Sequence, residues 1–315
     1  GLTPERKRQL HFSLAETLAE KVSLSENRSS SMEEAIARHY LGASSIKAIP
    51  FVINAAKNLT NNYSFEHALD LIDQAIALEP ALEPLISLLE LNSKALIKTG
   101  HIPEGLRSIR RLRSVIGKSN LKMPIEVELL EAKCHHEQGR YAESSGIVDS
   151  LLERLDPVSE HDSYYECLGE RIVLLVARGE TESANQQIDS VCNALCKKHD
   201  NSLAEAWLLQ TGASMILQMA ITDSQIYKKA ELYNQRALKV FRKFKNTLGL
   251  IKGYSKEASI HLRFRNIKEA QSSCRKSIRL ARKLGFRYLE LTLKPSLAQI
   301  LAMKGNYSGA IKELL

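Results

Sequence analysis

The sequence predicts an all-α fold, a solenoid of about seven helical hairpins stacked in one series. The composition favours helices, because aromatic residues make up only 6% of the chain while Leu, Ala, Lys and Glu abound. Apolar residues recur at helical spacing, and a small residue returns at a nearly constant interval along most of the chain. Repeats of roughly 20–50 residues are typical of solenoids, because each unit buries its apolar face only by stacking on its neighbours.

The chain opens with a pair of predicted leading helices, which occupy residues 1–45. The first runs from Pro4 to about Leu24, a polar Ser/Asn break follows, and the second covers residues 32–43. Residues 46–315 are predicted as one continuous array. Its last residues, AIKELL, read as an unfinished helix, so we expect an excised segment of a longer chain.

The first hairpin, predicted over 47–61 and 63–79, has the most regular pattern. Ala68, Ile72 and Ala75 lie on one helical face, with two small residues around one branched apolar residue. Small residues let the partner helix approach closely, and Pro80 ends the segment.

Each later unit repeats a helix, a tight turn and a second helix. The turns are TGHI (99–102), QGRY (138–141), RGET (178–181), RNIK (265–268) and KGNY (304–307). Gly suits the position after a helix because it tolerates positive φ. The small marker residues of the second helices are Ala68, Gly105, Ser144, Ala184, Ala230, Ala270 and Ala310, and the longest interval separates Ala184 from Ala230. We expect the longest unit, helices 202–220 and 224–245 with a turn near 220–227, to protrude or to change the curvature.

The hairpins resemble tetratricopeptide repeats (TPRs). The matching residues are Ala56, Ala68, Ile72, Ala75 and Pro80, then Tyr254, Ala258, Ala270 and Ser277, then Leu297, Ala298, Leu301, Gly305, Tyr307 and Ala310. The units are longer than the family's usual repeat, Gly105 and Ser144 replace Ala, and most units lack the closing Pro. The resemblance implies a right-handed α–α superhelix that binds a partner segment in its concave groove.

A narrower resemblance covers the N-terminal part of the chain, from residue 1 to about residue 80. The stretches RKRQLHFSLAETLAE and EEAIARHYLGA, with Ala37, His39 and Tyr40, are similar to the helical region behind the ATPase module of bacterial STAND-type regulators. These include maltotriose-responsive activators and multidomain kinases. The resemblance implies a nucleotide-binding switch upstream and an output module downstream of this segment.

The TPR resemblance also implies a groove. In that family the residue after the small position of the first helix faces the ligand, which here means Lys57, Lys94 and Lys133. Asn61 and Lys98 lie one turn further on the same face. A ladder of Lys could capture a carboxylate or an acidic peptide, although Lys is also common on exposed helix faces.

Charge is distributed unevenly along the chain. Residues 228–294 hold nineteen Lys or Arg and four Glu, a net charge of +15, whereas residues 124–190 have a net charge of −10. The predicted basic surface comprises Lys239, Arg242, Lys243, Lys245, Arg275, Lys276, Arg279, Arg282 and Lys283. It indicates solvated helix faces, a docking surface for an acidic partner or a neighbouring domain of the same chain, or a nucleic-acid interface. Nucleic acid is less favoured, because neither a helix-turn-helix pattern nor the aromatic interleaving of single-strand binders is visible.

No enzyme or cofactor motif is present, such as a phosphate loop, His-Glu-x-x-His or Gly-x-Ser-x-Gly. Cys192, Cys196 and His199 share one helix face, but zinc needs four ligands, so we interpret both cysteines as core residues. The pair His135–His136 is interpreted as a helix end. Trp207 and Tyr164–Tyr165 are interpreted as packing residues, with a patch for a hydrophobic peptide or small effector as the alternative.

The sequence therefore predicts a non-catalytic protein-interaction region without cofactor or metal, within a larger signalling or regulatory protein. Five scattered cysteines, no signal peptide and no apolar run of roughly 18 residues predict a cytoplasmic protein away from the membrane. The alternatives are an effector-sensing domain of a transcription regulator or kinase, and nucleic-acid binding through the basic repeats.

Overall fold

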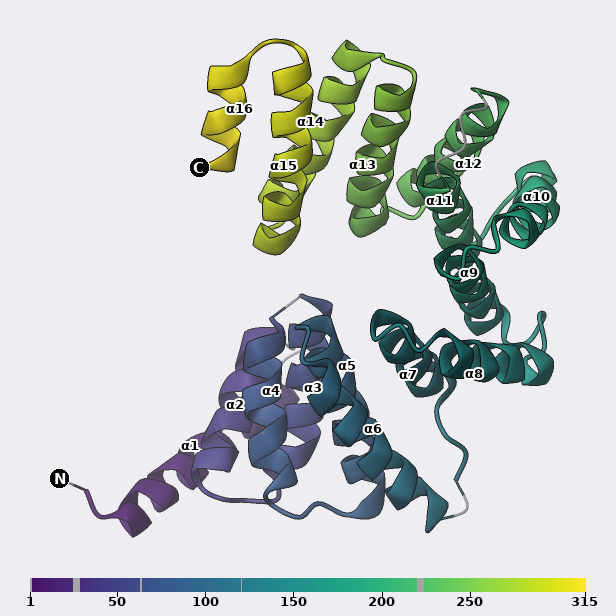
Figure 1. Ribbon diagram of the computed structural model, residues 1–315. Coiled ribbons are helices and arrows are strands. Elements are labelled where there is room, and N and C mark those ends of the chain that lie inside the picture. Colours follow the sequence, from purple (N-terminus) through teal and green to yellow (C-terminus); the bar gives the residue numbers. More distant parts are fainter. Residues whose placement is uncertain (1, 25–28, 63, 120, 220–223) are drawn as a thin grey trace. The chain divides into compact units, whose positions relative to one another are not determined.

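The computed structural model describes residues 2–24, 29–62, 64–119, 121–219 and 224–315, and every regular element in these ranges is a helix (Figure 1). The helices are α1 (Pro4–Leu24), α2 (Ser30–Gly42), α3 (Ala48–Asn61), α4 (Phe65–Ile76), α5 (Leu82–Lys98), α6 (Ile102–Gly117), α7 (Ile125–Glu137), α8 (Tyr141–Arg154), α9 (His161–Ala177), α10 (Thr181–Lys197), α11 (Leu203–Gln218), α12 (Ser224–Lys243), α13 (Thr247–Arg263), α14 (Ile267–Lys283), α15 (Arg287–Met303) and α16 (Tyr307–Leu314). This order confirms the all-α prediction. None of the described helices has both the length and the apolar content needed to cross a membrane.

The chain forms two compact units, Gly1–Cys134 (unit 1) and His135–Leu315 (unit 2). The boundary falls within α7, so unit 1 contains α1 to α6 and most of α7. Unit 2 contains the end of α7 and α8 to α16. The predicted division into leading helices 1–45 and an array 46–315 stays a prediction.

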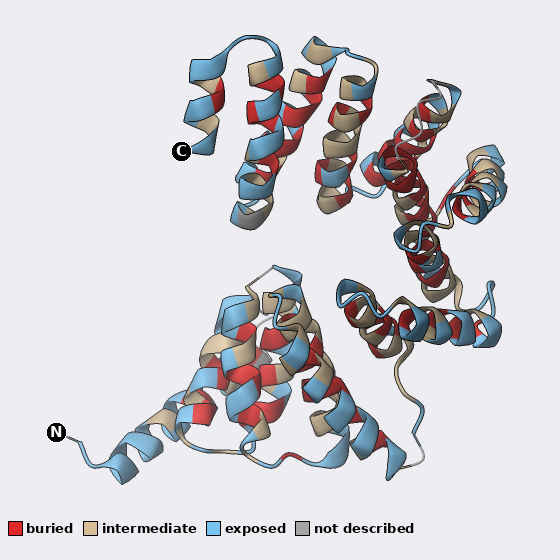
Figure 2. Ribbon diagram, viewed as in Figure 1, coloured by how far each residue is buried: buried red, intermediate tan, exposed pale blue. Residues whose placement is uncertain are grey.

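In unit 1 the helices from α1 to α6 pack against one another in sequence order. Buried residues from α1 to α5 form one continuous hydrophobic cluster (Figure 2). The His-Tyr pair of α2 helps to attach α1. The Tyr40 hydroxyl donates a hydrogen bond to Glu16 at 2.6 Å, and His39 Nδ1 lies 2.9 Å from His11 Nδ1.

The first hairpin, α3 with α4, has the predicted contact face. Ala68, Ile72 and Ala75 are fully buried, and the small side chains leave room for the helices beside them. Helix α4 ends at Ile76, before the predicted residue 79. The backbone N–H groups of Leu78 and Glu79 bond three residues back, to Ala75 and Ile76, and Glu79 has a φ of 51° directly before Pro80.

The turns confirm the predicted role of glycine. Positive φ angles occur at Gly100 (84°), Gly139 (72°), Gly179 (78°) and Gly305 (76°). In the RNIK turn, which lacks Gly, Arg265 adopts the same conformation with a φ of 58°. The turn between α11 and α12 includes residues 220–223, which lie outside the described residues.

Two small residues of the repeat pattern have direct packing explanations. At Gly105, which departs from the TPR pattern, an added Cβ would lie 2.5 Å from the Ile97 side chain, so even Ala would force Ile97 to move. Ser277, which matches the pattern, is fully buried, and its hydroxyl donates to the backbone carbonyl of Ile251 at 2.7 Å. The hydrogen bond offsets the desolvation of the hydroxyl.

Unit 2 is built around α11. Eleven residues of this helix are buried, and it packs against α9, α10, α12 and α13. The expected protrusion of the longest unit is therefore wrong for α11, whereas the alternative, a change of curvature, stays a prediction. Apart from Glu205, Gln210 and Gln218, the α11 sequence, LAEAWLLQTGASMILQ, consists of apolar or small residues, as expected for a helix enclosed by neighbours.

Close approach between α12 and α13 leads to a test of this packing. A Cβ at Gly249 would lie 2.4 Å from the Phe241 ring, whereas a Cβ at Gly146 in α8 would meet no atom within 4 Å. We expect Gly249→Ala to lower the free energy of unfolding by about 1–3 kcal/mol through overpacking. The matched control Gly146→Ala should raise it by up to about 1 kcal/mol through helix propensity. Urea denaturation measures both, and a neutral Gly249→Ala would contradict the close packing.

Candidate functional site

In unit 1, α3 and α5 are the first helices of the hairpins α3–α4 and α5–α6, and α7 comes next in the chain. Helix α5 packs against α3, and Lys94 of α5 forms an ion pair with Glu126 of α7. The helices α3, α5 and α7 therefore follow one another, and we call them the row of first helices. This row carries all the predicted groove residues, Lys57 and Asn61 on α3, Lys94 and Lys98 on α5, and Lys133 on α7.

These five residues differ in their surroundings. Lys57 and Asn61 are exposed, and their side chains have no polar partner among the described residues of unit 1. Lys98 is exposed, whereas Lys133 is half-buried. Lys57 can therefore pair with a ligand without first losing a contact to another described residue of unit 1.

Lys94 already has two carboxylate partners. Its ammonium donates to Glu90 at 2.8 Å and also to Glu126. Burial acts to lower the pKa of Lys94, but the hydrogen bonds to Glu126 and Glu90 outweigh it and raise the pKa. A ligand carboxylate would therefore have to compete with both glutamates for this lysine.

All nine residues of the predicted basic surface are exposed. They lie on α12, in the turn that follows it, and on α14. Two of them have carboxylate partners, since Lys243 pairs with Asp200 at 2.8 Å and Arg282 pairs with Glu290 at 2.6 Å.

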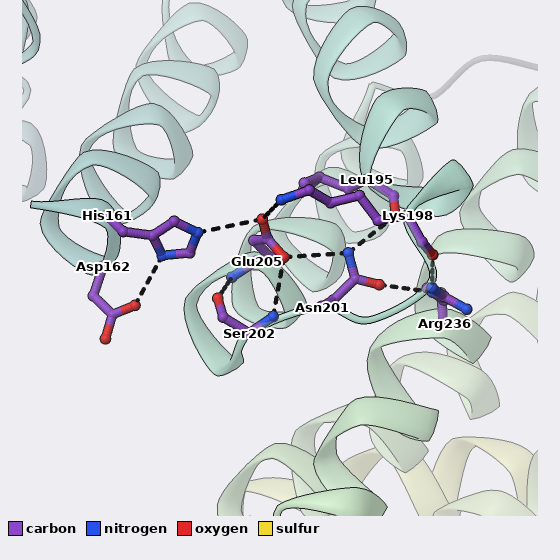
Figure 3. Close-up of polar contacts among 8 residues, drawn as sticks. All are labelled: His161, Asp162, Leu195, Lys198, Asn201, Ser202, Glu205 and Arg236. Atoms are coloured by element: carbon purple, nitrogen blue, oxygen red, sulfur yellow. Dashed lines mark hydrogen bonds and ion pairs between the residues drawn. The ribbon is translucent and has the colours of Figure 1, made fainter. Parts of the chain in front are cut away.

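A polar network in unit 2 is centred on Glu205 of α11, whose side chain is only 1% exposed (Figure 3). Ser202 caps α11. Its Oγ accepts from the Glu205 backbone N–H at 3.2 Å, and its own N–H donates to the Glu205 carboxylate at 3.0 Å. Lys198 also donates to the carboxylate, and Asn201 donates to it at 3.3 Å. The carboxylate is buried but well supplied with donors.

The network extends to neighbouring helices on both sides. His161 Nε2, in the first turn of α9, lies 3.3 Å from the Glu205 carboxylate. Arg236 of α12 donates to Asn201 at 2.7 Å and to the backbone carbonyl of His199 at 3.0 Å. These contacts join α9, α11 and α12, so we assign the network a structural role.

Opposing effects set the pKa of Glu205. Burial acts to raise it, but hydrogen bonds from Lys198 and from the Ser202 backbone outweigh burial and lower it. The hydrogen bond to Glu205 likewise raises the pKa of Lys198. The Ser-x-x-Glu spacing of a capping box was visible in the sequence, but the two distant partners on α9 and α12 gave no local signal.

The cysteine cluster belongs to the core. Cys192 is fully buried, and burial raises the pKa of its thiol to about 12. Cys196 is half-buried, whereas His199 is fully exposed near Asp200. Across the described ranges, no three His, Cys, Asp or Glu side chains lie together in a way that could hold a metal ion. At the end of α7, His136 Nδ1 lies 3.1 Å from Glu170, and this contact raises the pKa of His136.

The aromatic residues have packing roles. The Trp207 ring lies 4.8 Å from the Phe241 ring and packs on the core around α11. Tyr164 meets the Tyr165 ring edge-on at 5.7 Å. Tyr164 also lines a pocket of about 400 Å³ between α8 and α9, together with Asp149, Leu152, Glu153, Leu168 and Arg171.

Comparison with known proteins identifies the fold. No protein-family model matches the sequence, and no curated protein matches it by sequence. The Rap conjugation gene regulator of plasmid pLS20, in complex with the Phr* peptide, has a TM-score of 0.59 at 10% identity, over 98% of this chain and 89% of that chain. The apo quorum sensor NprR from B. thuringiensis has a TM-score of 0.54 at 10% identity, over 98% and 95%. A Rap protein complexed with Competence and Sporulation Factor has a TM-score of 0.54 at 12% identity, over 85% and 74%.

The chain has a TPR-like helical-repeat fold. At these identities the likeness concerns the fold alone, and it confirms the TPR-like solenoid predicted from the sequence. In TPR terms, α3 and α5 are first helices and α4 and α6 are second helices. The resemblance to STAND-type regulators stays a prediction.

The buried Glu205 carboxylate gives a test of the polar network that joins α9, α11 and α12. We expect Glu205→Gln to lower the free energy of unfolding at pH 7 by about 1.5–3 kcal/mol, because the hydrogen bond that Lys198 donates loses its charged acceptor. The matched control Glu153→Gln, on exposed α8 surface, should change it by less than about 0.5 kcal/mol.

The same variant has a defined pH dependence. Because folding lowers the pKa of Glu205, the contribution of this carboxylate to the free energy of unfolding is fully present above the ordinary glutamate pKa of about 4.3. The contribution is lost as the pH falls through the lowered pKa of the folded state. The stability difference between wild type and Glu205→Gln should therefore shrink on acidification, as thermal unfolding between neutral and acid pH would show. A difference that stays constant would contradict an ionised Glu205.

Proposed function

We propose that this chain is a non-catalytic protein-interaction module that binds an extended peptide or partner segment along the row of first helices in unit 1. The proposal rests on Lys57, Lys94 and Lys133, which lie on α3, α5 and α7 and which the TPR resemblance places at equivalent positions of successive repeats. Successive repeats thus offer a cation at a regular interval, which suits a ligand that runs across the helices.

Proteins of the same fold support a peptide partner. The Rap conjugation gene regulator is described in complex with the Phr* peptide, and a Rap protein with Competence and Sporulation Factor. Both resemble this chain over most of its length, with TM-scores of 0.59 and 0.54. The signalling role, the cytoplasmic setting and contacts with neighbouring domains of the same chain are further parts of our proposal.

The charges along the row of first helices indicate which charged groups the ligand should carry. Lys57, which has no partner in the described part of unit 1, is the strongest candidate to hold a ligand carboxylate, from an acidic side chain or a chain end. Around Lys94 the two glutamates place negative charge beside the cation. The ligand should therefore carry a carboxylate near Lys57 and neutral or mixed polar groups near Lys94.

A small-molecule effector is a weaker candidate. The pocket between α8 and α9 has a volume at the lower end of the usual range for ligand sites. Three of its lining residues, Asp149, Glu153 and Arg171, are charged, whereas effector pockets are lined mainly by apolar side chains. We therefore favour the peptide.

Binding of a synthetic library of acidic and C-terminal peptides tests the proposal. For the tightest peptide, Lys57→Ala/Lys94→Ala/Lys133→Ala should weaken affinity at least about tenfold, which corresponds to roughly 1.4 kcal/mol. Among single variants Lys57→Ala should have the largest effect, because this lysine gives up no described internal partner when it binds. Fluorescence polarisation measures the affinities.

The matched control removes three exposed lysines of unit 1 outside the row, at Lys7, Lys118 and Lys122. This control has the same net charge as the test variant but keeps the three lysines of the row. Its affinity for the peptide should therefore stay within about twofold of the wild-type value. Equal binding by wild type and the row variant would overturn the proposal.

A further inference from the structure

The chain topology gathers basic residues from two helices at one edge of unit 2. Helices α12, α13 and α14 pack in succession as antiparallel neighbours. The end of α12, the beginning of α13 and the end of α14 therefore lie on the same side. We call this side the basic edge, and its cations are Lys239, Arg242, Lys243, Lys245, Arg275, Lys276, Arg279, Arg282 and Lys283.

One tyrosine shows that the two rows of cations meet. Tyr254 of α13 has the Arg242 guanidinium carbon 5.9 Å from its ring centre and the Lys276 ammonium 5.7 Å from it. One cation comes from α12 and the other from α14. Arg242 and Lys276 therefore lie on one surface, where the basic faces of α12 and α14 meet across α13.

The positive charge of the basic edge is largely uncompensated. After Glu231 in α12 and Glu269 in α14, neither helix contains another acidic residue. In the described residues, Lys239, Lys245, Arg279 and Lys283 have no carboxylate partner. The negative end of a helix dipole favours cations in the last turn only, so it does not account for Lys239, Arg275 and Lys276 further back.

An exposed aromatic ring lies in the same surface. Phe244 follows the last residue of α12, is 47% exposed, and has the Lys243 ammonium 5.7 Å from its ring centre. Tyr254 is half-buried between the cations of the two helices. Phe244 already lies between Lys243 and Lys245 in the sequence, whereas only the tertiary structure brings Tyr254 beside Arg242 and Lys276.

We propose that the basic edge binds single-stranded nucleic acid. Residues three or four apart on a helix are neighbours on its surface, with Cβ atoms about 5–6 Å apart, so their cations offer a series of contacts to a phosphate backbone. Arginine forks suit phosphate oxygens, and an exposed ring offers a stacking face for a base. An acidic protein segment would use the cations but would give no role to Phe244. This surface is in unit 2, and the inference does not depend on the peptide site of unit 1.

The charge contribution is tested with the full chain and a fluorescent single-stranded DNA 20-mer of mixed sequence. Lys239→Gln/Arg279→Gln/Lys283→Gln should weaken binding at least tenfold in 50 mM salt. It should also reduce the slope of log affinity against log salt by about 2, because each lost phosphate contact contributes about 0.7.

The matched control, Lys228→Gln/Lys268→Gln/Lys304→Gln, also removes three exposed cations. These lie near the beginnings of α12 and α14 and directly after α15, away from the basic edge. The control should leave most of the affinity. An equal loss of DNA affinity in both variants would show that net charge alone causes it, and would contradict a binding site at the basic edge.

Stacking is tested by Phe244→Leu. Affinity for the same DNA should fall by about tenfold while the salt slope stays unchanged, because stacking involves no counterion release. Circular dichroism and the melting temperature verify that each variant is folded. If a poly-glutamate peptide competes as well as DNA per charge and Phe244→Leu binds like wild type, the basic edge is a docking surface for acidic protein and the nucleic-acid proposal fails.

Discussion

The structure depends on one packing constraint, the close approach of neighbouring helices at small residues. A two-helix hairpin has an apolar face that it cannot bury alone, so each hairpin must place that face against the next. Ala68 and Ala75 permit this contact in the first hairpin. Where helices approach even more closely, as at Gly105 beside Ile97 and Gly249 beside Phe241, even a methyl group would displace the neighbouring side chain.

The placement of charged residues depends on hydrogen bonding and hydration, not on the space between helices. The buried carboxylate of Glu205 is surrounded by donors, because an ionised group inside the protein is tolerated only when it is hydrogen-bonded. Lys57 and the cations of the basic edge are exposed, where water meets their hydration needs at little cost. Charges satisfied within the protein stabilise the fold, and exposed charges without a carboxylate partner in the described chain are available to a ligand.

The two proposed binding surfaces belong to different units and differ in chemistry. The row in unit 1 combines lysine with glutamate, which suits a peptide with few carboxylates at defined positions. The basic edge in unit 2 is almost free of acidic residues and includes an exposed ring, which suits a polyanion with aromatic bases. A TPR-like scaffold accommodates both, because its core is formed by the contact faces and leaves the outer faces variable.

The sequence by itself determined the helical class, the order of the hairpins, the glycine turns and the family resemblance. These features are local, since they follow from the spacing of small and apolar residues within single helices. It also identified the nine basic residues of unit 2 and the five residues of the row. Only the tertiary structure decided which charges are paired and which rings lie beside them. The partners of Lys94 and Glu205, the enclosure of α11, and the meeting of Arg242, Tyr254 and Lys276 depend on residues distant in sequence that packing brings together.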